Sequence, residues 1–239
     1  MTTKLLYQYD SYLKENIARV REVIGNKIVF NTTIFHPRSG GVDHDTGKLV
    51  KDGGEYRVVQ VLIDKNIGDV VHIVDGEHDL KVGDVVKQVI DWNRRYKLMR
   101  LHTAAHILAS IMYNEHGALI TGGNISEEYA YDDYSLEEFN KELFLDIVEK
   151  ANQIIKRNIE VKIYWLPREE ALKIPGIVKL AKRTPPNIDV LRIVEIPGVD
   201  IQADGGPHVK NTGEIGEIVP LKIVNKGRKR KRLYYTVKP

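Results

Sequence analysis

The chain has 239 residues, 29% of them charged and none of them cysteine, and its formal net charge is +3. This composition is typical of a globular protein with room for one large domain or two smaller ones, and the lack of cysteine excludes disulfides and thiol catalysis. No apolar run approaches the roughly 20 residues of a membrane helix, and the first ten residues contain no apolar signal core, so we expect a cytoplasmic protein with no membrane contact.

The first part of the chain is predicted to form β structure. Residues 18–24 and 27–35 are rich in β-branched side chains, and Gly25-Asn26 between them is typical of a two-residue hairpin turn. Further short strands are predicted at residues 56–64, 70–74 and 85–91. Several short strands without intervening helices favour a small barrel or a sandwich.

The pattern changes near residue 92, where helices begin to alternate with strands. Apolar residues spaced by three and four predict a helix over residues 98–114, and Ser135 followed by Glu138 is typical of a capping box that starts a second helix, ending near residue 157. A short helix is predicted at 168–173, and strands at 159–165, 190–196, 218–224 and 232–237. This mixture predicts an α+β domain, so we divide the chain into domains 1–94 and 95–239.

A pair of histidines on the first predicted helix suggests a metal site. His102 and His106 are four residues apart, so they share one helix face and can reach the same ion. Zinc peptidases have the same spacing but place a Glu after the first His, and this chain has Thr103 there. By itself the pair is weak evidence for a metal site, because most such helical pairs are packed or exposed histidines.

A second pair of candidate ligands lies about 100 residues further along the chain. Asp204 and His208 flank Gly205-Gly206-Pro207, which predicts a turn because Gly and Pro break helices. Alone, this segment could be a surface turn with a capping Asp. The two pairs together indicate one mononuclear metal site, which is structural if all four residues bind at once and catalytic if one position opens.

A dense basic run, residues 226–232, lies near the C-terminus. It is either a solvated strand end or a patch that contacts phosphates, and the residues alone leave both interpretations open.

Three blocks of sequence resemble the AlaX family, free-standing relatives of the editing domain of alanyl-tRNA synthetase. The helix HTAAH (102–106) is similar to the family's HTAxH, and DGGPHV (204–209), continuing into TGEIG (212–216), is similar to its CGGTHV loop. TIFHPRSGGVDHDTG (33–47) resembles the glycine-rich stretch TxFYPxGGGQxxDxG of the longer members. The order and spacing of the blocks cover nearly the whole chain.

The resemblance implies a fold, a reaction and a cofactor. It implies a small N-terminal β-barrel followed by an α+β domain of the threonyl/alanyl-tRNA synthetase editing type. The implied activity is trans-editing, the zinc-dependent hydrolysis of tRNA(Ala) wrongly charged with serine or glycine. One zinc ion per chain is implied at His102, His106, Asp204 and His208, with no catalytic residue assigned beyond the metal site.

The resemblance also assigns contacts to the substrate. Thr33 is similar to a family threonine associated with recognising the hydroxyl of serine, and Gly40 and Gly41 would let the backbone approach the substrate closely. An ordinary strand threonine and a simple turn are the competing interpretations. Contact with tRNA phosphates is expected at Arg228, Lys229, Arg230, Lys231 and Arg232. Glu214 and the five remaining histidines are expected to be structural, packing or surface residues.

The chain departs from the family pattern at four positions. Asp204 replaces the usual Cys, which exchanges a soft ligand for a hard one, and Pro207 replaces the usual Thr. Ser39 and Val42 replace a Gly and a Gln of the glycine-rich stretch, so the amino-acid specificity stays open. Two alternative functions also remain: a non-catalytic, zinc-stabilised tRNA-binding module, and a zinc hydrolase of another ester or amide. A monomer and a homodimer are both consistent with the sequence.

Overall fold

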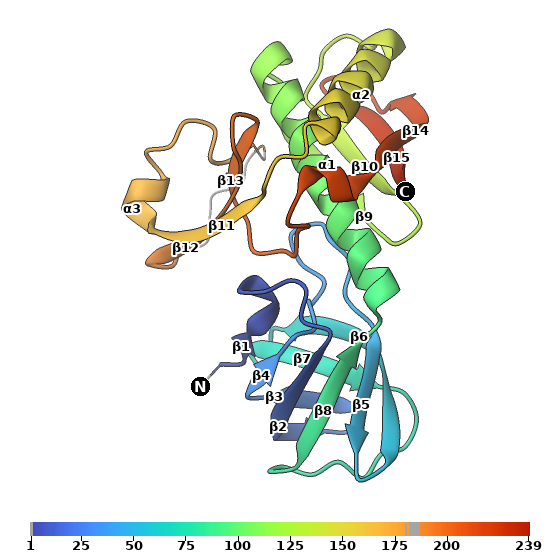
Figure 1. Ribbon diagram of the computed structural model, residues 1–239, viewed down its shortest axis with the longest axis vertical. Helices are drawn as coiled ribbons and strands as arrows, with labels where there is room; N and C mark the ends of the chain where they lie inside the picture. Colours follow the sequence, from blue (N-terminus) through green and yellow to red (C-terminus); the bar gives the residue numbers. More distant parts are fainter. Residues whose placement is uncertain (1, 180, 182–186) are drawn as a thin grey trace. The chain divides into compact units, whose positions relative to one another are not determined.

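The computed structural model describes residues 2–179, 181 and 187–239, and it divides the chain into two compact units, Met1–Tyr96 and Lys97–Pro239 (Figure 1). Helix α1 (Trp92–His116) begins in the first unit and continues in the second. No helix among the described residues combines the length and apolarity needed to cross a bilayer.

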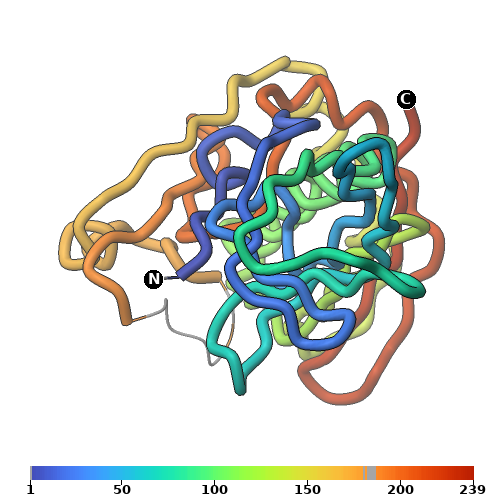
Figure 2. Tube along the Cα trace, turned by 90° about the horizontal axis from the view of Figure 1, so that it is seen from below, coloured from blue at the N-terminus to red at the C-terminus, as the bar shows by residue number. Residues whose placement is uncertain are grey.

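The first unit is a closed barrel, as predicted. Its strands are β2 (Glu15–Ile24), β3 (Lys27–Phe30), β5 (Gly47–Lys51), β6 (Gly54–Asp64), β7 (Asp69–Val74) and β8 (Val85–Ile90), which follow the order β2-β3-β7-β6-β5-β8 around the barrel. Outside it, β1 (Lys4–Leu5) pairs in parallel with β4 (Thr32–Thr33), and residues 6–8 form a short 3₁₀ helix. The trace of this unit, from blue to green, can be followed from a second direction in Figure 2.

The barrel strands agree with the sequence prediction in part. The predicted hairpin turn is confirmed, because Ile24 pairs with Lys27 and Gly25 has a φ of 55°. The predicted strand over residues 27–35 is wrong as one element, since β3 ends at Phe30. Strand β5 was missed. Its first residue, Gly47, is held so close to β8 that a Cβ would lie 2.2 Å from the Val89 carbonyl oxygen.

A buried ion pair lies inside the barrel unit. Arg95 and Asp45 are both 0% exposed, and Arg95 Nε donates to Asp45 Oδ1 at 2.9 Å. The other guanidinium nitrogens donate to the carbonyl oxygens of Ser11, at 2.9 Å, and Ile34, at 2.5 Å. Asp45 also accepts the backbone N–H of His36 at 2.6 Å. The charge on each side chain is therefore compensated within this unit.

A neutral histidine is enclosed in the same barrel. His72 is 0% exposed, and its Nδ1 donates to the carbonyl of Ile28 at 3.1 Å. That tautomer leaves Nε2 to accept the hydroxyl of Thr33 at 2.8 Å. Burial lowers the pKa of His72 to about 4, so the ring stays uncharged at neutral pH.

The second unit contains two antiparallel sheets. The first has the strand order β14 (Glu217–Asn225), β15 (Lys231–Lys238), β10 (Ala130–Tyr134) and β9 (Ile120–Ile125), and α2 (Lys141–Lys156) packs against it. The second has the order β11 (Lys162–Pro167), β12 (Val190–Ile196) and β13 (Asp200–Ala203), with α3 (Arg168–Ala171) between β11 and β12. A short 3₁₀ helix spans Thr212–Ile215. In both views, β11, α3 and β12 lie on an arm that extends away from α1 and α2 (Figures 1 and 2).

The α+β class predicted for this part is confirmed, but one helix start is wrong. Helix α2 begins at Lys141, where the side chain of Asn140 accepts the backbone N–H of Glu142 at 2.9 Å. The predicted cap, Ser135, instead accepts the backbone N–H of Leu119 through its hydroxyl at 2.8 Å. A tertiary hydrogen bond therefore takes the group that the capping-box pattern assigned to the helix.

Candidate metal centre

Helix α1 carries the first two candidate ligands. His102 and His106 are 5% and 6% exposed, and their ring centroids are 5.0 Å apart in an edge-to-face arrangement. One helical turn separates the two residues, which places both imidazoles on the same side of α1. The predicted pairing of these histidines is therefore present in the structure.

The other two candidate ligands come from the loop that follows β13. Asp204 and His208 flank a tight turn in which Gly206 N donates to Asp204 Oδ1 at 2.7 Å. A Cβ at Gly206 would lie 2.7 Å from His102 Cε1, so only glycine lets the loop approach the helix this closely. Arg192 Nη1 binds the carbonyl oxygens of Asp204, at 2.9 Å, and Gly206, at 3.0 Å, and so fixes the loop from the neighbouring strand.

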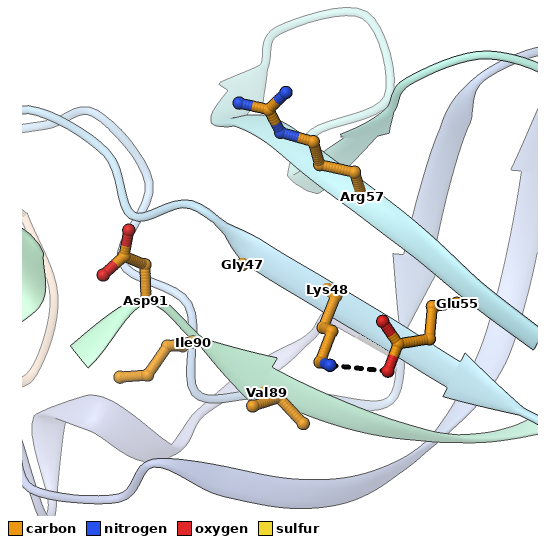
Figure 3. A pocket seen from close by; sticks show the side chains of 7 residues that line it. All are labelled: Gly47, Lys48, Glu55, Arg57, Val89, Ile90 and Asp91. Carbon is orange, nitrogen blue, oxygen red and sulfur yellow. Dashed lines mark hydrogen bonds and ion pairs between the residues drawn. The ribbon is translucent and has the colours of Figure 1, made fainter. Parts of the chain in front are cut away.

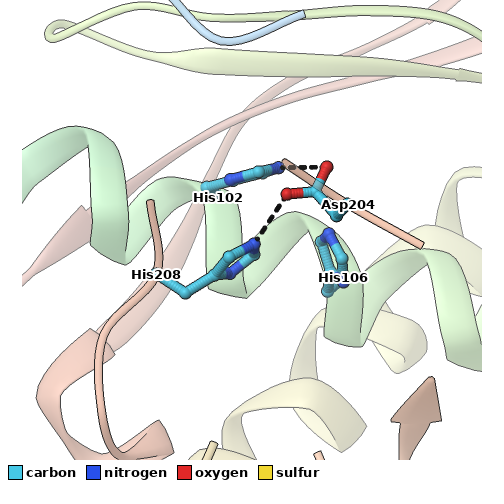
Figure 4. A group of neighbouring side chains, drawn as sticks. All are labelled: His102, His106, Asp204 and His208. Carbon is cyan, nitrogen blue, oxygen red and sulfur yellow. Dashed lines mark hydrogen bonds and ion pairs between the residues drawn. The ribbon is translucent and has the colours of Figure 1, made fainter. Parts of the chain in front are cut away.

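The four side chains converge on one point (Figure 4). One ligand atom from each of His102, His106, Asp204 and His208 can be chosen so that all four atoms lie within 4.8 Å of one another. His208 Nε2 is 3.2 Å from Asp204 Oδ1, and His102 Nε2 is 3.7 Å from Asp204 Oδ2. The rings of His102 and His208 stack at 4.1 Å.

Hydrogen bonds on the outer side of the cluster fix the histidine tautomers. His102 Nδ1 is 3.2 Å from the carbonyl oxygen of Pro207, and His106 Nδ1 is 2.9 Å from Asp200 Oδ2. Because both partners only accept, both Nδ1 atoms carry the proton. In the neutral ring, Nε2 then carries the lone pair, and this is the form of histidine that binds a metal ion.

Thr103 completes the same arrangement for His208. Thr103 Oγ1 donates to the carbonyl of Met99 at 3.1 Å and accepts the backbone N–H of Val209 at 3.3 Å. Its remaining lone pair faces His208 Nδ1 at 3.0 Å, so this nitrogen donates. Thr103 thus orients the ring of His208.

The electrostatics of the cluster suit a cation. Burial lowers the pKa of His208 well below its usual value, and the neighbouring His102 lowers it further, so the ring is neutral. Burial raises the pKa of Asp204, but the histidines around it, His102 first, outweigh this effect and hold the pKa well below its usual range. Three imidazole rings and one carboxylate form a donor set that a divalent ion such as zinc accepts.

A second carboxylate supports the cluster from behind. Asp200 lies beside His106 and also pairs with Lys179 Nζ at 2.7 Å, both side chains being at most 4% exposed. Burial raises the pKa of Asp200, yet its contacts with His106 and Lys179 lower it overall, so the carboxylate stays ionised. Neither residue was predicted from the sequence, because β13 has only four residues and Lys179 stands 21 positions before Asp200.

Known proteins match both units. Residues 191–234 match the family described as the threonyl and alanyl tRNA synthetase second additional domain, and residues 3–94 match class II (A) tRNA synthetases. Over 238 residues, the chain is 56% identical to the alanyl-tRNA editing protein AlaX-M of Saccharolobus solfataricus, an alignment that covers 99% of this chain and 100% of that protein. This chain belongs to the AlaX-M family of alanyl-tRNA editing proteins.

More distant relatives agree with this assignment. The AlaX-M protein of Methanosarcina barkeri is 43% identical, over 98% of this chain and 99% of its own length. The alanine–tRNA ligase of Staphylothermus marinus is 37% identical over 92% of this chain but only 24% of the ligase. The family predicted from three sequence blocks is thus confirmed.

The residues of the AlaX-M glycine-rich stretch lie in the barrel unit. Thr33 is 0% exposed; its hydroxyl donates to His72 and accepts the backbone N–H of Phe35 at 3.0 Å. Gly40 and Gly41 have φ values of 62° and 90° and form a two-residue turn. The turn is thus explained by backbone conformation, and substrate contact by these three residues stays a prediction.

The basic run divides into an exposed part and a buried part. Arg228, Lys229 and Arg230 are exposed in the connection between β14 and β15. Lys231 and Arg232 begin β15 and are 2% and 9% exposed. Arg232 Nε donates to Asp133 Oδ1 at 2.7 Å, and its guanidinium stacks on Tyr131 at 3.7 Å, so Arg232 has a structural role in the sheet.

A pocket of about 430 Å³ on the barrel has none of the features of the metal centre (Figure 3). It is lined by Gly47, Lys48, Glu55, Arg57, Val89, Ile90 and Asp91. Lys48 and Glu55 form an ion pair across it at 2.5 Å. The pocket contains no histidine, and none of the residues predicted to bind substrate lines it.

Proposed function

We propose that this AlaX-M protein hydrolyses the ester bond between serine or glycine and tRNA(Ala), and that it does so with one zinc ion held by His102, His106, Asp204 and His208. The observation that carries the proposal is the convergence of four ligand atoms within 4.8 Å, combined with histidine tautomers that expose the metal-binding nitrogens. A zinc ion bound there supplies positive charge that polarises an ester carbonyl and makes water more acidic.

The burial of the ligands favours a catalytic site over a closed structural one. The side chains of the three histidines are at most 7% exposed, whereas that of Asp204 is 20% exposed. Solvent therefore reaches the cluster on the side of Asp204, and a substrate ester would approach from there. A closed structural site needs no such access.

The protein's own groups hold this geometry before substrate arrives. Asp200, Pro207 and Thr103 each fix one imidazole through its Nδ1 atom. Arg192 holds the loop that carries Asp204 and binds its carbonyl oxygen. Such preorganisation positions the reacting ester without reorganisation during the reaction.

Contact with the body of tRNA is proposed at Arg228, Lys229 and Arg230. These three side chains are exposed, and the connection that carries them bears a net positive charge suited to phosphates. The buried Lys231 and Arg232 support the strand beneath them. Replacing the exposed residues is expected to weaken binding and reduce its salt dependence without altering the chemical step.

Deacylation of tRNA(Ala) charged with serine, glycine or alanine tests the proposal. We expect loss of serine or glycine with alanine spared, abolished by a chelator and restored by zinc. Asp204→Ala is expected to lower the rate by about a thousandfold or more, because the ion contributes several kcal/mol to the transition state. His116→Ala, which removes a partly exposed histidine at the end of the same helix, serves as the matched control.

Two results would contradict the deacylase assignment. If the protein binds zinc and tRNA but hydrolyses none of the three esters, the deacylase assignment is wrong. The zinc-stabilised tRNA-binding module then replaces it. Hydrolysis that does not require the tRNA body would instead support a general esterase.

A further inference from the structure

The sheet β11-β12-β13 has two unlike faces. On one face, Leu191 and Ile193 of β12 form a buried cluster with Ala171 and Ile177. Tyr164, Leu166, Ile174, Val178, Ile201 and Ala203 pack against this cluster. Side chains alternate between the faces of a strand, so the neighbouring residues on β11, β12 and β13 point the other way.

That second face turns toward the metal centre. It carries Asp200 and Gln202 of β13, and both side chains contact His106 Nδ1, at 2.9 and 3.4 Å. Arg192 of β12 is on the same face and binds the loop carbonyls of Asp204 and Gly206. The face is therefore continuous with the proposed catalytic site.

A single row of residues leads across this face from the edge of the sheet to the metal ligand. Trp165 on the outer strand β11 is paired with Arg192, and the backbone N–H of Asp204 donates to the carbonyl of Arg192 at 3.1 Å. Trp165 on β11, Arg192 on β12 and Asp204, the first residue after β13, thus stand side by side. Two strand spacings, roughly 10 Å in all, separate the first from the last.

The outer end of the row presents an aromatic surface. Trp165 is 38% exposed, and Val190, on the same face of β12, is 49% exposed. Arg192 beside them is 6% exposed, because its guanidinium is turned into the loop. An exposed indole on a sheet is a surface on which single-stranded nucleic acids stack their bases.

We infer that Trp165 stacks against the base of the 3′-terminal adenosine of tRNA and so places the ester on its ribose beside Asp204. The inference rests on the proposed function and names the residue that holds the acceptor end. The distance along the row matches the scale of one nucleoside, whose ribose lies between the base and the esterified hydroxyl. Arg192 links the two ends, since it flanks the indole and fixes the ligand loop.

Tryptophan fluorescence tests the contact directly. The chain has two tryptophans, so a Trp92→Phe variant leaves Trp165 as the sole indole. Uncharged tRNA(Ala) with a complete 3′ end is expected to quench this fluorescence, and the same tRNA without its terminal adenosine is expected to bind without quenching. Equal quenching by both, or none when gel-shift binding is saturated, overturns the inference.

Steady-state kinetics distinguish a role of Trp165 in positioning the substrate from a role in stabilising the fold. We expect Trp165→Ala to raise KM for the mischarged tRNA by about tenfold to a hundredfold, the range measured for loss of one stacked base. The value of kcat is expected to stay unchanged, because the indole would stack on the base equally in the ground state and the transition state. The zinc content is also expected to stay unchanged. Trp165→Phe is expected to recover most of the affinity.

A matched control excludes a general effect of removing an exposed apolar side chain. Leu221→Ala removes a residue of β14 that is 54% exposed and lies in the other sheet, and it should leave KM unchanged. If Trp165→Ala lowers the zinc content or kcat while KM holds, Trp165 is structural and the inference is wrong.

The fluorescence and kinetic assays can refute the stacking contact without refuting the proposed function, and the reverse also holds. Robust deacylation with an unaltered KM in Trp165→Ala refutes the stacking contact and leaves the enzyme assignment intact. Quenching that depends on the terminal adenosine, without deacylation, supports the contact and refutes the enzyme assignment.

Discussion

Histidine is buried in both units, but its surroundings differ. In the barrel unit His72 is a single neutral ring, and both of its nitrogens are hydrogen-bonded to protein groups. In the second unit His102, His106 and His208 have their Nδ1 atoms bound in the same way, yet their Nε2 atoms converge around Asp204. His72 has protein partners on both nitrogens, whereas the cluster groups three imidazoles and a carboxylate where a metal ion could bind.

The same contrast holds for the buried charges. Arg95 and Asp45 neutralise each other and bind backbone groups with their remaining atoms. In the second unit the pair Lys179 and Asp200 also neutralises itself, but Asp200 reaches on to His106. Burial of polar groups therefore serves stability in one unit and ligand orientation in the other, and each can be tested by breaking one pair.

Breaking the barrel's ion pair should have the largest effect. Arg95→Met leaves Asp45 buried without its cation, and we expect it to lower the free energy of unfolding by about 3–5 kcal/mol. Urea unfolding measures the change. Lys48→Met is the control, because the side chains of Lys48 and Glu55 are 42% and 57% exposed and such a surface pair is worth about 1 kcal/mol or less. Equal losses in the two variants would contradict the role of the buried pair.

The neutral histidine should make the barrel sensitive to acid. The pKa of His72 is about 4 in the folded protein against 6.5 for the free side chain, so between these values the unfolded state binds the extra proton. Stability is therefore complete above pH 6.5 and falls by up to about 3 kcal/mol as the pH approaches 4. Urea unfolding of the wild type and of His72→Gln at several pH values checks this, because the difference between the two profiles isolates His72. Parallel profiles would refute it.

In the second unit, loss of the buried carboxylate of Asp200 should lower the affinity for zinc. Asp200→Asn removes the anionic acceptor of His106 Nδ1, and we expect zinc affinity to fall by about tenfold to a hundredfold. Competition with a chelating dye measures the affinity. The double variant Lys179→Met/Asp200→Asn removes both charges and should regain folding stability without regaining affinity. An unchanged affinity in Asp200→Asn would show that orientation of His106 does not depend on the carboxylate.

The smallest expected effect concerns the glycine turn of the barrel. Gly40 has a φ of 62° with open space around its Cα, so Gly40→Ala is expected to cost about 1 kcal/mol through backbone strain alone. Gly40→Asn, which tolerates this conformation, should cost less. If Gly40→Asn keeps stability but loses deacylation, close backbone approach to the substrate explains the glycine better than the turn does.

The candidate metal cluster could be predicted from sequence because each of its two pairs is local. His102 and His106 are set by helix spacing, and Asp204 and His208 by a turn that Gly and Pro require. Asp200 could not be predicted, because its contact with His106 joins residues 94 positions apart. Such contacts depend on tertiary packing that periodicity does not contain.

The missed strands have a related cause. Strand β9 contains Gly122-Gly123 and β10 contains Asp132-Asp133, both of which are typical of turns. The structure explains them by packing: a Cβ at Gly123 would lie 2.8 Å from Asp132 Oδ1, and Asp133 pairs with Arg232 of β15. Local propensity was overridden by cross-strand partners.

The carboxylate at position 204 affects how the candidate metal site would respond to peroxide. A thiolate in the position of Asp204 could be oxidised by peroxide to sulfenic or sulfinic acid, and the ion would then be released. The chain has no cysteine anywhere, and imidazole and carboxylate groups are not part of that oxidation ladder. The candidate donor set therefore offers peroxide no sulfur atom to oxidise.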